Sequence, residues 1–450
     1  MSSPRCIDGR PSDGSEWFPQ MSDDKACNGS HHDELLKLLQ AFGKIGETES
    51  GGIARLAASL ADGDARNFLC AWLKQHDFTV LIDAVGNIYG VLDLKRGTPE
   101  KHFFCGSHLD SQPEAGKFDG ALGVACGCIA ALCIQERVER NQLDPGFRYF
   151  VVCCWTGEEG ARFQPSLTGS TVFAGARSAA ETLAITDGEG ISLATALDAI
   201  GYRGSDTIPR ADQYLEIHIE QSTKLERARF PVGLVTSCWG AKKIRLVLNG
   251  VPDHTGPTPM EDRRNALLAA SHAIITVEEL ATRSGTILYS SVGRIEVQPN
   301  SPNTIADQVT LWIEFRSPDE ATLDLAEKEL LAALGEIEKR TGCSADIAGL
   351  ETRKVVAFDQ PTLTAIGRAL EANSIPYLHL TTIAGHDAVR LQEVCPSTLL
   401  FVPSRAGITH SPEEYTSDDD VCAGFDAMLV ALLCLLARPE TEYDTRSASQ

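Results

Sequence analysis

The sequence predicts an α/β protein of two domains, and three observations lead to this. Its 450 residues exceed the ~100–200 residues of a typical single domain. Short apolar strands alternate with helices, and polar side chains follow directly after several of those strands. A middle segment has a βαββαβ order that is complete in itself. We therefore expect a mixed sheet flanked by helices, with a ferredoxin-like domain inserted into it.

The larger domain is expected over residues 35–227 and 349–440, after a flexible N-terminal segment of residues 1–34. Helical spacing of apolar residues predicts its helices, and apolar runs bounded by turn residues predict its strands. In chain order these are helices 33–46 and 65–78, two strands within 79–94, strand 101–110, buried helix 120–137, strand 147–160, helix 361–375, strand 397–403 and helix 418–439. Residues 441–450 are expected to be a disordered tail.

The inserted domain is expected over residues 228–348. The same patterns predict its six elements as strand 241–251, helix 263–283, strands 285–298 and 308–316, helix 321–341 and strand 343–351.

The composition is that of an ordinary globular protein, with 43% hydrophobic and 23% charged residues. A net charge of −22 and the lack of a Lys/Arg-rich run argue against nucleic acid as a partner. No two of the 14 cysteines have C-x-x-C spacing, and most lie in apolar stretches, so we expect reduced core residues. Because we find no signal peptide and no apolar run of ~18–20 residues, we expect a cytoplasmic protein without a membrane partner.

Several short motifs place metal-ligating side chains after predicted strands. His108 in GSHLDS offers an imidazole nitrogen, and Asp110 can accept the other ring N–H and so fix the tautomer. Asp119 in KFDGALG precedes a glycine and a buried helix. There its carboxylate could bridge two cations, or it could simply cap the helix.

Glu158 and Glu159 stand in tandem after the apolar strand FVVCCW, where adjacent carboxylates repel each other unless a cation lies near. Glu159 is a candidate metal ligand. Glu158 is a candidate base that takes a proton from water and returns it to a leaving nitrogen. A solvated acidic turn is the alternative interpretation of this motif.

Two further histidines complete the set. His218 lies on the alternating strand YLEIHIEQ and shares one face with Glu216 and Glu220, which a bound metal would compensate. His410 follows a glycine-containing loop in RAGITHSPEEY. Each motif alone is weak evidence, but their joint occurrence in one α/β frame predicts a metal centre.

The motifs together resemble the amidase, hydantoinase and carbamoylase family of the metallopeptidase and deacylase superfamily. This family contains N-carbamoyl-L-amino-acid hydrolases, β-ureidopropionases and allantoate amidohydrolases, and the likeness runs from about residue 35 to 435. It implies a metallopeptidase-like catalytic domain, a lid and dimerisation domain, and hence a homodimer. The segments that carry it are GSHLDSQPEAGKFDGALGV, TGEEGARFQPSLTGSTVFAG, YLEIHIEQ, HTGPTPMEDRRNAL, PNSPNTIADQVTLWIEFRSP, AGHDA and ITHSPEE.

The resemblance also implies two divalent metal ions per subunit, usually zinc, with manganese, cobalt or nickel as substitutes. Asp119 would bridge them and Glu158 would be the general base. The two ligand sets implied are His108, Asp119 and His218 for one ion, and Asp119, Glu159 and His410 for the other.

Other matching positions imply contacts with the substrate. His254 matches a lid histidine that stabilises the oxyanion across the dimer. Arg316 is the natural clamp for a carboxylate because its planar fork pairs bidentately, although a surface ion pair is an alternative. The implied substrate-binding residues are Gln221, Asn303, Arg316, Gly385 and His386.

Four positions depart from the family pattern without removing a predicted ligand. Ser222 and Ala115 stand where glycine is usual, Asn265 where aspartate is frequent, and Ser404 where cysteine is frequent. We expect them to affect substrate preference.

The expected activity is therefore hydrolysis of the C–N bond of an N-carbamoyl (ureido) amino acid or a related linear amide. The products would be ammonia, carbon dioxide and the free amino acid, from a small substrate that bears a carboxylate. Two alternatives stay open. One is an aminoacylase or dipeptidase of the same superfamily, and the other is a non-catalytic relative that binds a ligand.

Overall fold

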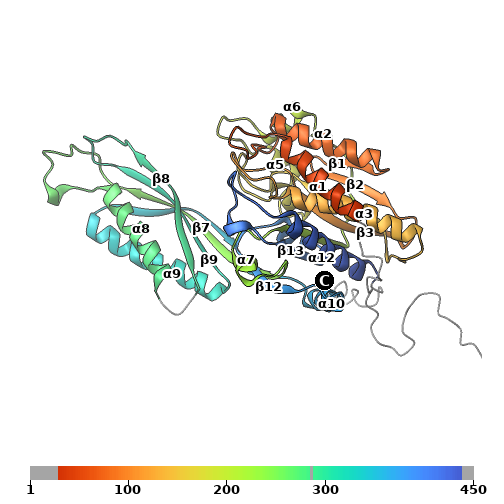
Figure 1. Cartoon of the computed structure of the whole chain (residues 1–450). Helices are drawn as coiled ribbons and strands as arrows, with labels where there is room; N and C mark the ends of the chain where they lie inside the picture. Colours follow the sequence, from red (N-terminus) through yellow and green to blue (C-terminus); the bar gives the residue numbers. More distant parts are fainter. Residues whose placement is uncertain (1–28, 284–286, 438–450) are drawn as a thin grey trace, which may run out of the picture. The chain divides into compact units, whose positions relative to one another are not determined.

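The computed structural model describes residues 29–283 and 287–437. The predictions for residues 1–28 and for the tail at 441–450 lie outside the described residues. The described chain forms two compact units (Figure 1). Unit 2 comprises Ser237–Ala357 and Thr381–Ala384, and unit 1 comprises the rest.

Unit 1 is built on a mixed sheet of nine strands in the order β1-β2-β4-β3-β5-β13-β6-β11, with β12 paired to β6. The four central strands β4, β3, β5 and β13 are parallel, whereas β1, β2 and β6 pair antiparallel with their neighbours. The carboxyl ends of the central strands therefore lie at one end of the sheet. The strands are β1 (Thr79–Ile82), β2 (Ile88–Asp93), β3 (Thr98–His108), β4 (Phe147–Trp155), β5 (Gln213–Ile219), β6 (Val232–Cys238), β11 (Val356–Ala357), β12 (Tyr377–Thr382) and β13 (Ser397–Val402).

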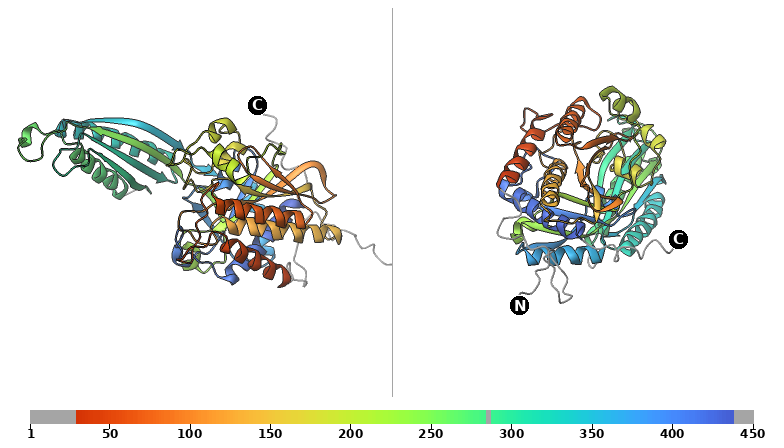
Figure 2. Two further views of the ribbon diagram at one scale, coloured as in Figure 1. Left: turned by 90° about the horizontal axis from the view of Figure 1, so that it is seen from above. Right: turned by 90° about the vertical axis from the view of Figure 1, so that its right-hand side faces the viewer.

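Helices cover both faces of this sheet (Figure 2). Adjacent residues of β5 point to opposite faces. Ile217 lies against the glycines of α3 and α12, whereas Glu216 bonds to α11 on the other face. The helices are α1 (Gly29–Lys44), α2 (Leu60–Gln75), α3 (Ala121–Glu139), α4 (Thr168–Phe173), α5 (Ala179–Leu183), α6 (Leu193–Ile200), α7 (Lys224–Ala228), α10 (Gln360–Ala372), α11 (Asp387–Leu391) and α12 (Asp418–Leu436).

Helix α3 is long and apolar enough to cross a membrane by composition, but most of it is buried inside unit 1. It packs on β3, β4 and β5 and is covered by α1 and α12, which explains why it is apolar all round. The cysteines of the described chain are free thiols, and Cys126, Cys128, Cys153 and Cys154 are buried. They are core residues, as expected.

Unit 2 holds a four-stranded antiparallel sheet in the order β10-β7-β9-β8. Along the chain the elements follow the order βαββαβ. The spatial order of the four strands in the sheet is that of a ferredoxin-like fold. Both helices contribute to one apolar core with the sheet (Figure 2). The elements are β7 (Gly240–Asn249), α8 (Ala266–Thr282), β8 (Tyr289–Gln298), β9 (Gln308–Ser317), α9 (Glu320–Thr341) and β10 (Ser344–Arg353).

Three boundaries differ from those expected. Unit 2 runs to Ala357 instead of ending at residue 348, and its strand β10 continues to Arg353 in pairing with β7. Unit 2 begins at Ser237 instead of residue 228, because β6 pairs with β13 inside the large sheet. Helix α1 begins at Gly29, so residues 29–34 are helical where we expected a flexible segment. His31 in its first turn is buried, as are Leu35 and Leu38 further along, so the start of the helix is packed against the rest of unit 1.

Candidate metal centre

The ligands predicted in the larger domain come together at the carboxyl ends of the parallel strands. His108 is the last residue of β3, and His218 is the penultimate residue of its neighbour β5. Glu158 and Glu159 follow β4, and His410 lies in the loop after β13. Loops after parallel strands meet at one end of the sheet, which is where α/β proteins place their sites.

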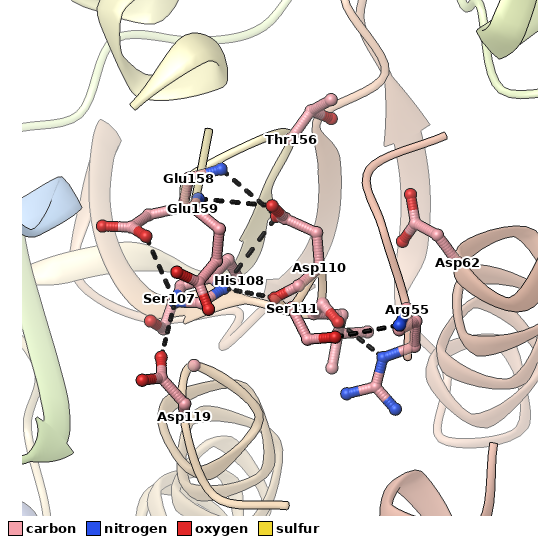
Figure 3. Close-up of polar contacts among 12 residues, drawn as sticks. Arg55, Asp62, Ser107, His108, Asp110, Ser111, Asp119, Thr156, Glu158 and Glu159 are labelled. Carbon is pink, nitrogen blue, oxygen red and sulfur yellow. Dashed lines mark hydrogen bonds and ion pairs between the residues drawn. The ribbon is translucent and has the colours of Figure 1, made fainter. Parts of the chain in front are cut away.

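The first group of ligands, here called the inner trio, consists of His108, Asp119 and His218. One donor atom from each lies within 4.8 Å of the other two. Asp119 Oδ1 is 3.4 Å from His108 Nε2 and 3.2 Å from His218 Nε2. All three side chains are buried (Figure 3 shows His108 and Asp119 facing each other). His108 Nε2 has no hydrogen-bond partner among the described residues, so a donor atom is available at this point.

The second group, here called the outer trio, consists of Asp119, Glu159 and His410. His410 Nε2 is 3.3 Å from Glu159 Oε2 and 3.7 Å from Asp119 Oδ2. Glu159 Oε2 accepts a hydrogen bond from Gln112 Nε2 at 2.8 Å. Glu159 Oε1 is buried and has no such partner within the described part of the chain. Asp119 thus presents Oδ1 to the inner trio and Oδ2 to the outer trio.

Helix α3 begins directly after Asp119. The N-cap is Gly120, at φ 66°, and no side chain caps the helix. The alternative interpretation of Asp119 as a helix cap is therefore wrong. Its carboxylate is directed instead at the histidines, which leaves it available as a shared ligand.

The carboxylates of the site are strongly perturbed. Burial raises the pKa of Glu158 well above its usual value, and neighbouring carboxylates raise it further although His108 lowers it. Burial and then Asp119 raise the pKa of Glu159 to about 8. Burial would also raise the pKa of Asp119, but His218 and His108 outweigh it and hold the pKa well below its usual value. Buried carboxylates in this number call for a compensating cation.

Asp110 contacts His108 through its backbone carbonyl, whereas we expected its carboxylate to make this contact. Its backbone carbonyl, and not its carboxylate, lies 2.9 Å from His108 Nδ1, whereas Oδ1 is 3.9 Å away, too far for a hydrogen bond. The carboxylate accepts the backbone N–H groups of Glu158 at 3.2 Å and Glu159 at 3.3 Å (Figure 3). Gly157, at φ 64°, turns the chain after β4 just before these two groups. Asp110 therefore orients the histidine and the tandem acids together.

Comparison with known proteins identifies the family. The model of peptidase family M20/M25/M40 matches residues 104–433. The N-carbamoyl-L-amino-acid amidohydrolase of Rhizobium meliloti is 33% identical over 89% of this chain and 95% of that protein. A solved amidase of the hydantoinase/carbamoylase family from Burkholderia vietnamiensis has 31% identity and a TM-score of 0.80, covering 92% of this chain and 100% of that one. The chain belongs to peptidase family M20/M25/M40.

A more distant relative is the allantoate amidohydrolase of Bacillus subtilis, which is 29% identical over 88% of this chain and 95% of that protein. Family membership confirms the predicted resemblance, the mixed α/β fold and a hydrolase that acts on amide C–N bonds. Peptidase family M20/M25/M40 is a family of metal-dependent hydrolases. The donor atoms of this centre are therefore expected to suit metal ions.

The donor atoms of this family member fit divalent cations. His108 Nδ1 donates to the Asp110 carbonyl, and His218 Nδ1 lies 3.0 Å from the Ile219 carbonyl. Since a carbonyl can only accept, both Nδ1 atoms carry a proton, and both Nε2 atoms face Asp119, with His218 Nε2 also 3.2 Å from the Gly120 backbone nitrogen. Each Nε2 would have to be unprotonated to ligate a cation. A ligating histidine fixed in this way by its other nitrogen is the usual arrangement at metal sites.

Gln112 and Glu414 were not predicted to belong to the site, and Glu216 was predicted only as a neighbour of His218 on the same face of its strand. Gln112 bonds to Glu159, and the buried Glu216 accepts from Ser107 Oγ at 2.7 Å and from the Ala388 N–H at 2.8 Å. Glu414 is also buried and bonds to the loop that carries Asp119. The available signal was their presence inside the motifs GSHLDSQ, YLEIHIEQ and ITHSPEE.

Three of the residues predicted to hold the substrate lie in unit 1. Gln221, at φ 57°, donates from Nε2 to Asp119 Oδ2 at 2.8 Å. The His386 ring centroid is 4.6 Å from that of His218, and Gly385 directly precedes it. The structure therefore brings Gln221 and His386 to the predicted ligands, whereas their contact with substrate stays a prediction.

The other two, Asn303 and Arg316, belong to unit 2, as does His254, the predicted oxyanion residue. His254 and Asn303 lie near each other, since residue 254 forms an isolated bridge with Thr304 and the Thr255 N–H donates to the Asn303 carbonyl at 3.2 Å. Arg316 on β9 donates to Glu314 Oε2 at 3.0 Å and to the Ile383 carbonyl at 3.0 Å. Their roles toward a substrate stay predictions.

The four departures from the family pattern have local structural roles. Ser404 Oγ accepts the Gln221 N–H at 3.1 Å, and Ser222 donates to the carboxylate two residues before it. Asn265 is the N-cap of α8, and Ala115 is buried in an isolated bridge with residue 53. An effect of Asn265 on substrate preference has no support in these contacts, whereas Ser404 holds a residue of the site.

Proposed function

We propose that the chain is a two-metal amidohydrolase that cleaves the C–N bond of N-carbamoyl (ureido) amino acids or a related linear amide. The observation that carries the proposal is the pair of trios that share Asp119, with Glu158 Oε2 3.6 Å from His108 Nε2. The names of the relatives support a ureido substrate, because N-carbamoyl amino acids and allantoate both contain that group.

The inner trio would hold one cation and the outer trio the other, with Asp119 shared between them. Zinc is the proposed metal, since imidazole nitrogen and carboxylate oxygen are ligands that it takes, and manganese, cobalt or nickel could use the same set. When bound, the cations supply Lewis acidity that polarises the scissile carbonyl and lowers the pKa of water.

Glu158 is the proposed proton carrier. The Glu158 carboxylate is buried beside the inner trio. Asp110 binds only the backbone N–H of Glu158, so the Glu158 side chain is available for proton transfer. It takes a proton from the attacking water and later gives it to the departing nitrogen. For a ureido substrate, one water and the substrate yield the free amine, ammonia and carbon dioxide, which balances all atoms.

The proposal includes a carboxylate on the substrate, recognised by Arg316, and oxyanion stabilisation by His254. It also includes a homodimer formed through unit 2 and residence in the cytoplasm. The substrate contacts and the homodimer are supported by the matching motifs PNSPNT and HTGPTPM and by the resemblance of unit 2 to the lid domain of the family.

A substrate panel tests the proposal. The chelated protein is reloaded with zinc, manganese, cobalt or nickel and assayed on N-carbamoyl, N-formyl and N-acetyl amino acids, allantoate and dipeptides. We expect the highest kcat/KM on a ureido substrate. A preference for N-acetyl amino acids or dipeptides would instead support an aminoacylase or dipeptidase. A protein that binds no metal and turns over nothing on the panel would be a non-catalytic relative.

A further inference from the structure

We infer that Glu414 is a positioning residue that clamps the loop carrying Asp119 to the loop carrying His410 and so sets the metal affinity of the outer trio. The inference rests on the proposed function, because it assumes that this trio holds a cation. It adds a residue to the site that binds neither the metal nor the substrate.

The contacts of Glu414 form the clamp. Its Oε1 accepts the backbone N–H groups of Phe118 at 3.0 Å and Asp119 at 3.1 Å. Its Oε2 is 3.2 Å from Thr409 Oγ1, which is the residue before His410. The Glu414 residue is only 5% exposed, so its carboxylate is held in one place. One side chain thus ties two loops that are about 290 positions apart in sequence.

The Asp119 loop is shaped around this carboxylate. A Cβ atom placed on Gly116 would lie 2.2 Å from Glu414 Oε1, so no larger residue fits there without displacing the side chain. Thr409 Oγ1 also lies 3.1 Å from Asp119 Oδ2. The single Thr409 hydroxyl proton is therefore shared between Asp119 Oδ2 and Glu414 Oε2, while Glu414 Oε1 accepts the Asp119 N–H. These contacts link the two loops and restrain the spacing between them.

The outer trio is the part of the centre that needs such support. The His410 side chain is 44% exposed, whereas those of His108 and His218 are almost fully buried. His410 has a backbone φ of 52°, and Ala406 before it has a φ of 54°. A non-glycine residue in this conformation persists only where surrounding contacts hold it. The contacts from Glu414 to Thr409 supply one such restraint.

Glu414 acts through hydrogen bonds and not as a ligand. Within the described residues it belongs to no group of three donors that could hold a metal, and both of its oxygens are already engaged. A glutamine can make the same bonds, because its carbonyl oxygen can accept both N–H groups and its amide can donate to Thr409 Oγ1. The Thr409 hydroxyl then donates its one hydrogen bond to Asp119 Oδ2.

This predicts distinct results for two substitutions at one position. Glu414→Ala releases both loops and should weaken the binding of one of two zinc ions by about 10–100-fold, the usual effect of losing a residue that orients a ligand. The zinc ion of the inner trio should lose less affinity than this, because Asp119 Oδ1 is also held between the buried His108 and His218. Glu414→Gln should restore the weakened affinity to within about threefold of wild type.

The matched control is Glu413→Ala, which removes the neighbouring glutamate. The Glu413 side chain is exposed to solvent, so both zinc affinities should stay unchanged. Thr409→Val removes one arm of the clamp while keeping the shape of the side chain. This substitution should weaken the binding of the same zinc ion by a few-fold.

The experiment is calorimetric titration of the chelated full-length chain with zinc, with thermal unfolding of each variant to establish that it is folded. Equal weakening in Glu414→Gln and Glu414→Ala would overturn the clamp, since the charge or ligation would then matter. Unchanged binding in Glu414→Ala and Thr409→Val would overturn it as well. A wild-type chain that binds fewer than two zinc ions would overturn both the clamp and the proposed function. Normal zinc binding with no turnover of any ureido substrate would overturn the proposed function alone.

Discussion

Asp119 and Glu158 are both buried carboxylates of one site, yet their surroundings give them different tasks. Asp119 has His108 and His218 on one oxygen and His410 near the other. His218 and His108 hold the pKa of Asp119 well below its usual value, against the effect of burial. Glu158 has a pKa raised mainly by burial. A carboxylate kept ionised between histidines suits a shared metal ligand, and one with a raised pKa suits proton transfer.

At this scale the first prediction concerns Glu158. Glu158→Gln should keep both metal ions and lower kcat by about 10²–10⁴-fold, the range that a positioned proton carrier contributes. The measurement is steady-state turnover of a ureido substrate together with the metal content of the purified variant. Glu189→Gln, at an exposed loop position, is the control and should behave as wild type. A Glu158→Gln variant with near-wild-type turnover would contradict its role as base.

Arg316 gives a second prediction at the scale of a residue. Arg316→Lys should raise KM at least about tenfold for a substrate with a carboxylate, because a lysine cannot pair bidentately. The matched measurement uses the corresponding substrate with a neutral amide, whose KM should not change. Arg340→Lys, on the exposed face of α9, is the control. Equal effects on both substrates would show that Arg316 serves the structure of unit 2 through Glu314 and Ile383.

At the scale of elements, the site depends on how strands end and how α3 begins. His108 ends β3, and the next metal-ligating segment leads into α3 through Gly120 at φ 66°. A Cβ atom on Gly120 would lie 2.4 Å from His108 Cε1, so the start of the helix lies directly on the ring of a ligand. The backbone at this junction therefore determines where the histidine can sit.

Gly120→Ala should consequently displace the His108 ring and strain the left-handed backbone. We expect about 1–3 kcal/mol of destabilisation and at least about tenfold weaker binding of one metal ion. Thermal unfolding and zinc titration measure the two effects. Gly335→Ala in α9 is the control, because a Cβ atom there meets nothing within 4 Å, and it should be neutral or stabilising by about 0.5–1 kcal/mol. Unaltered zinc binding in Gly120→Ala would contradict this account of the junction.

The strand-end ligands could be predicted because the sequence places polar motifs directly after apolar strands. His108, Glu159 and His218 were proposed as ligands in that way, and the structure places all three at the carboxyl ends of the parallel strands. The mixed sheet followed from the same alternation. The carbonyl of Asp110 that orients His108, and the reach of Glu414 to the Asp119 loop, could not be predicted. Both depend on turn geometry and on contacts between segments far apart in the chain, which no local pattern encodes.

At the scale of the whole molecule, the two units differ in what they contribute. Unit 1 contains every member of the two trios, drawn from segments spread between residues 108 and 410. Unit 2 contains His254, Asn303 and Arg316 and has an apolar core of its own. The first boundary of unit 2 was misjudged because β6, an ordinary apolar strand in sequence, pairs within the large sheet.

Ligands from such distant segments come together only in the folded chain, so metal ions should stabilise it. With free zinc at about 100 times the Kd, each ion should add about 2.7 kcal/mol to the free energy of unfolding. Differential scanning calorimetry of the chelated and reloaded protein measures this. An unfolding midpoint that does not change with zinc would show that the ligands are not assembled as described.

The central claim is that two cations, sharing Asp119, are needed for hydrolysis. The most direct test adds zinc stepwise to the fully chelated protein and follows bound zinc and turnover of an N-carbamoyl amino acid in the same samples. The account predicts two tightly bound ions per chain, no turnover without metal, and full turnover only as the second ion binds. Full turnover in the presence of chelator, or with a single bound ion, would contradict it.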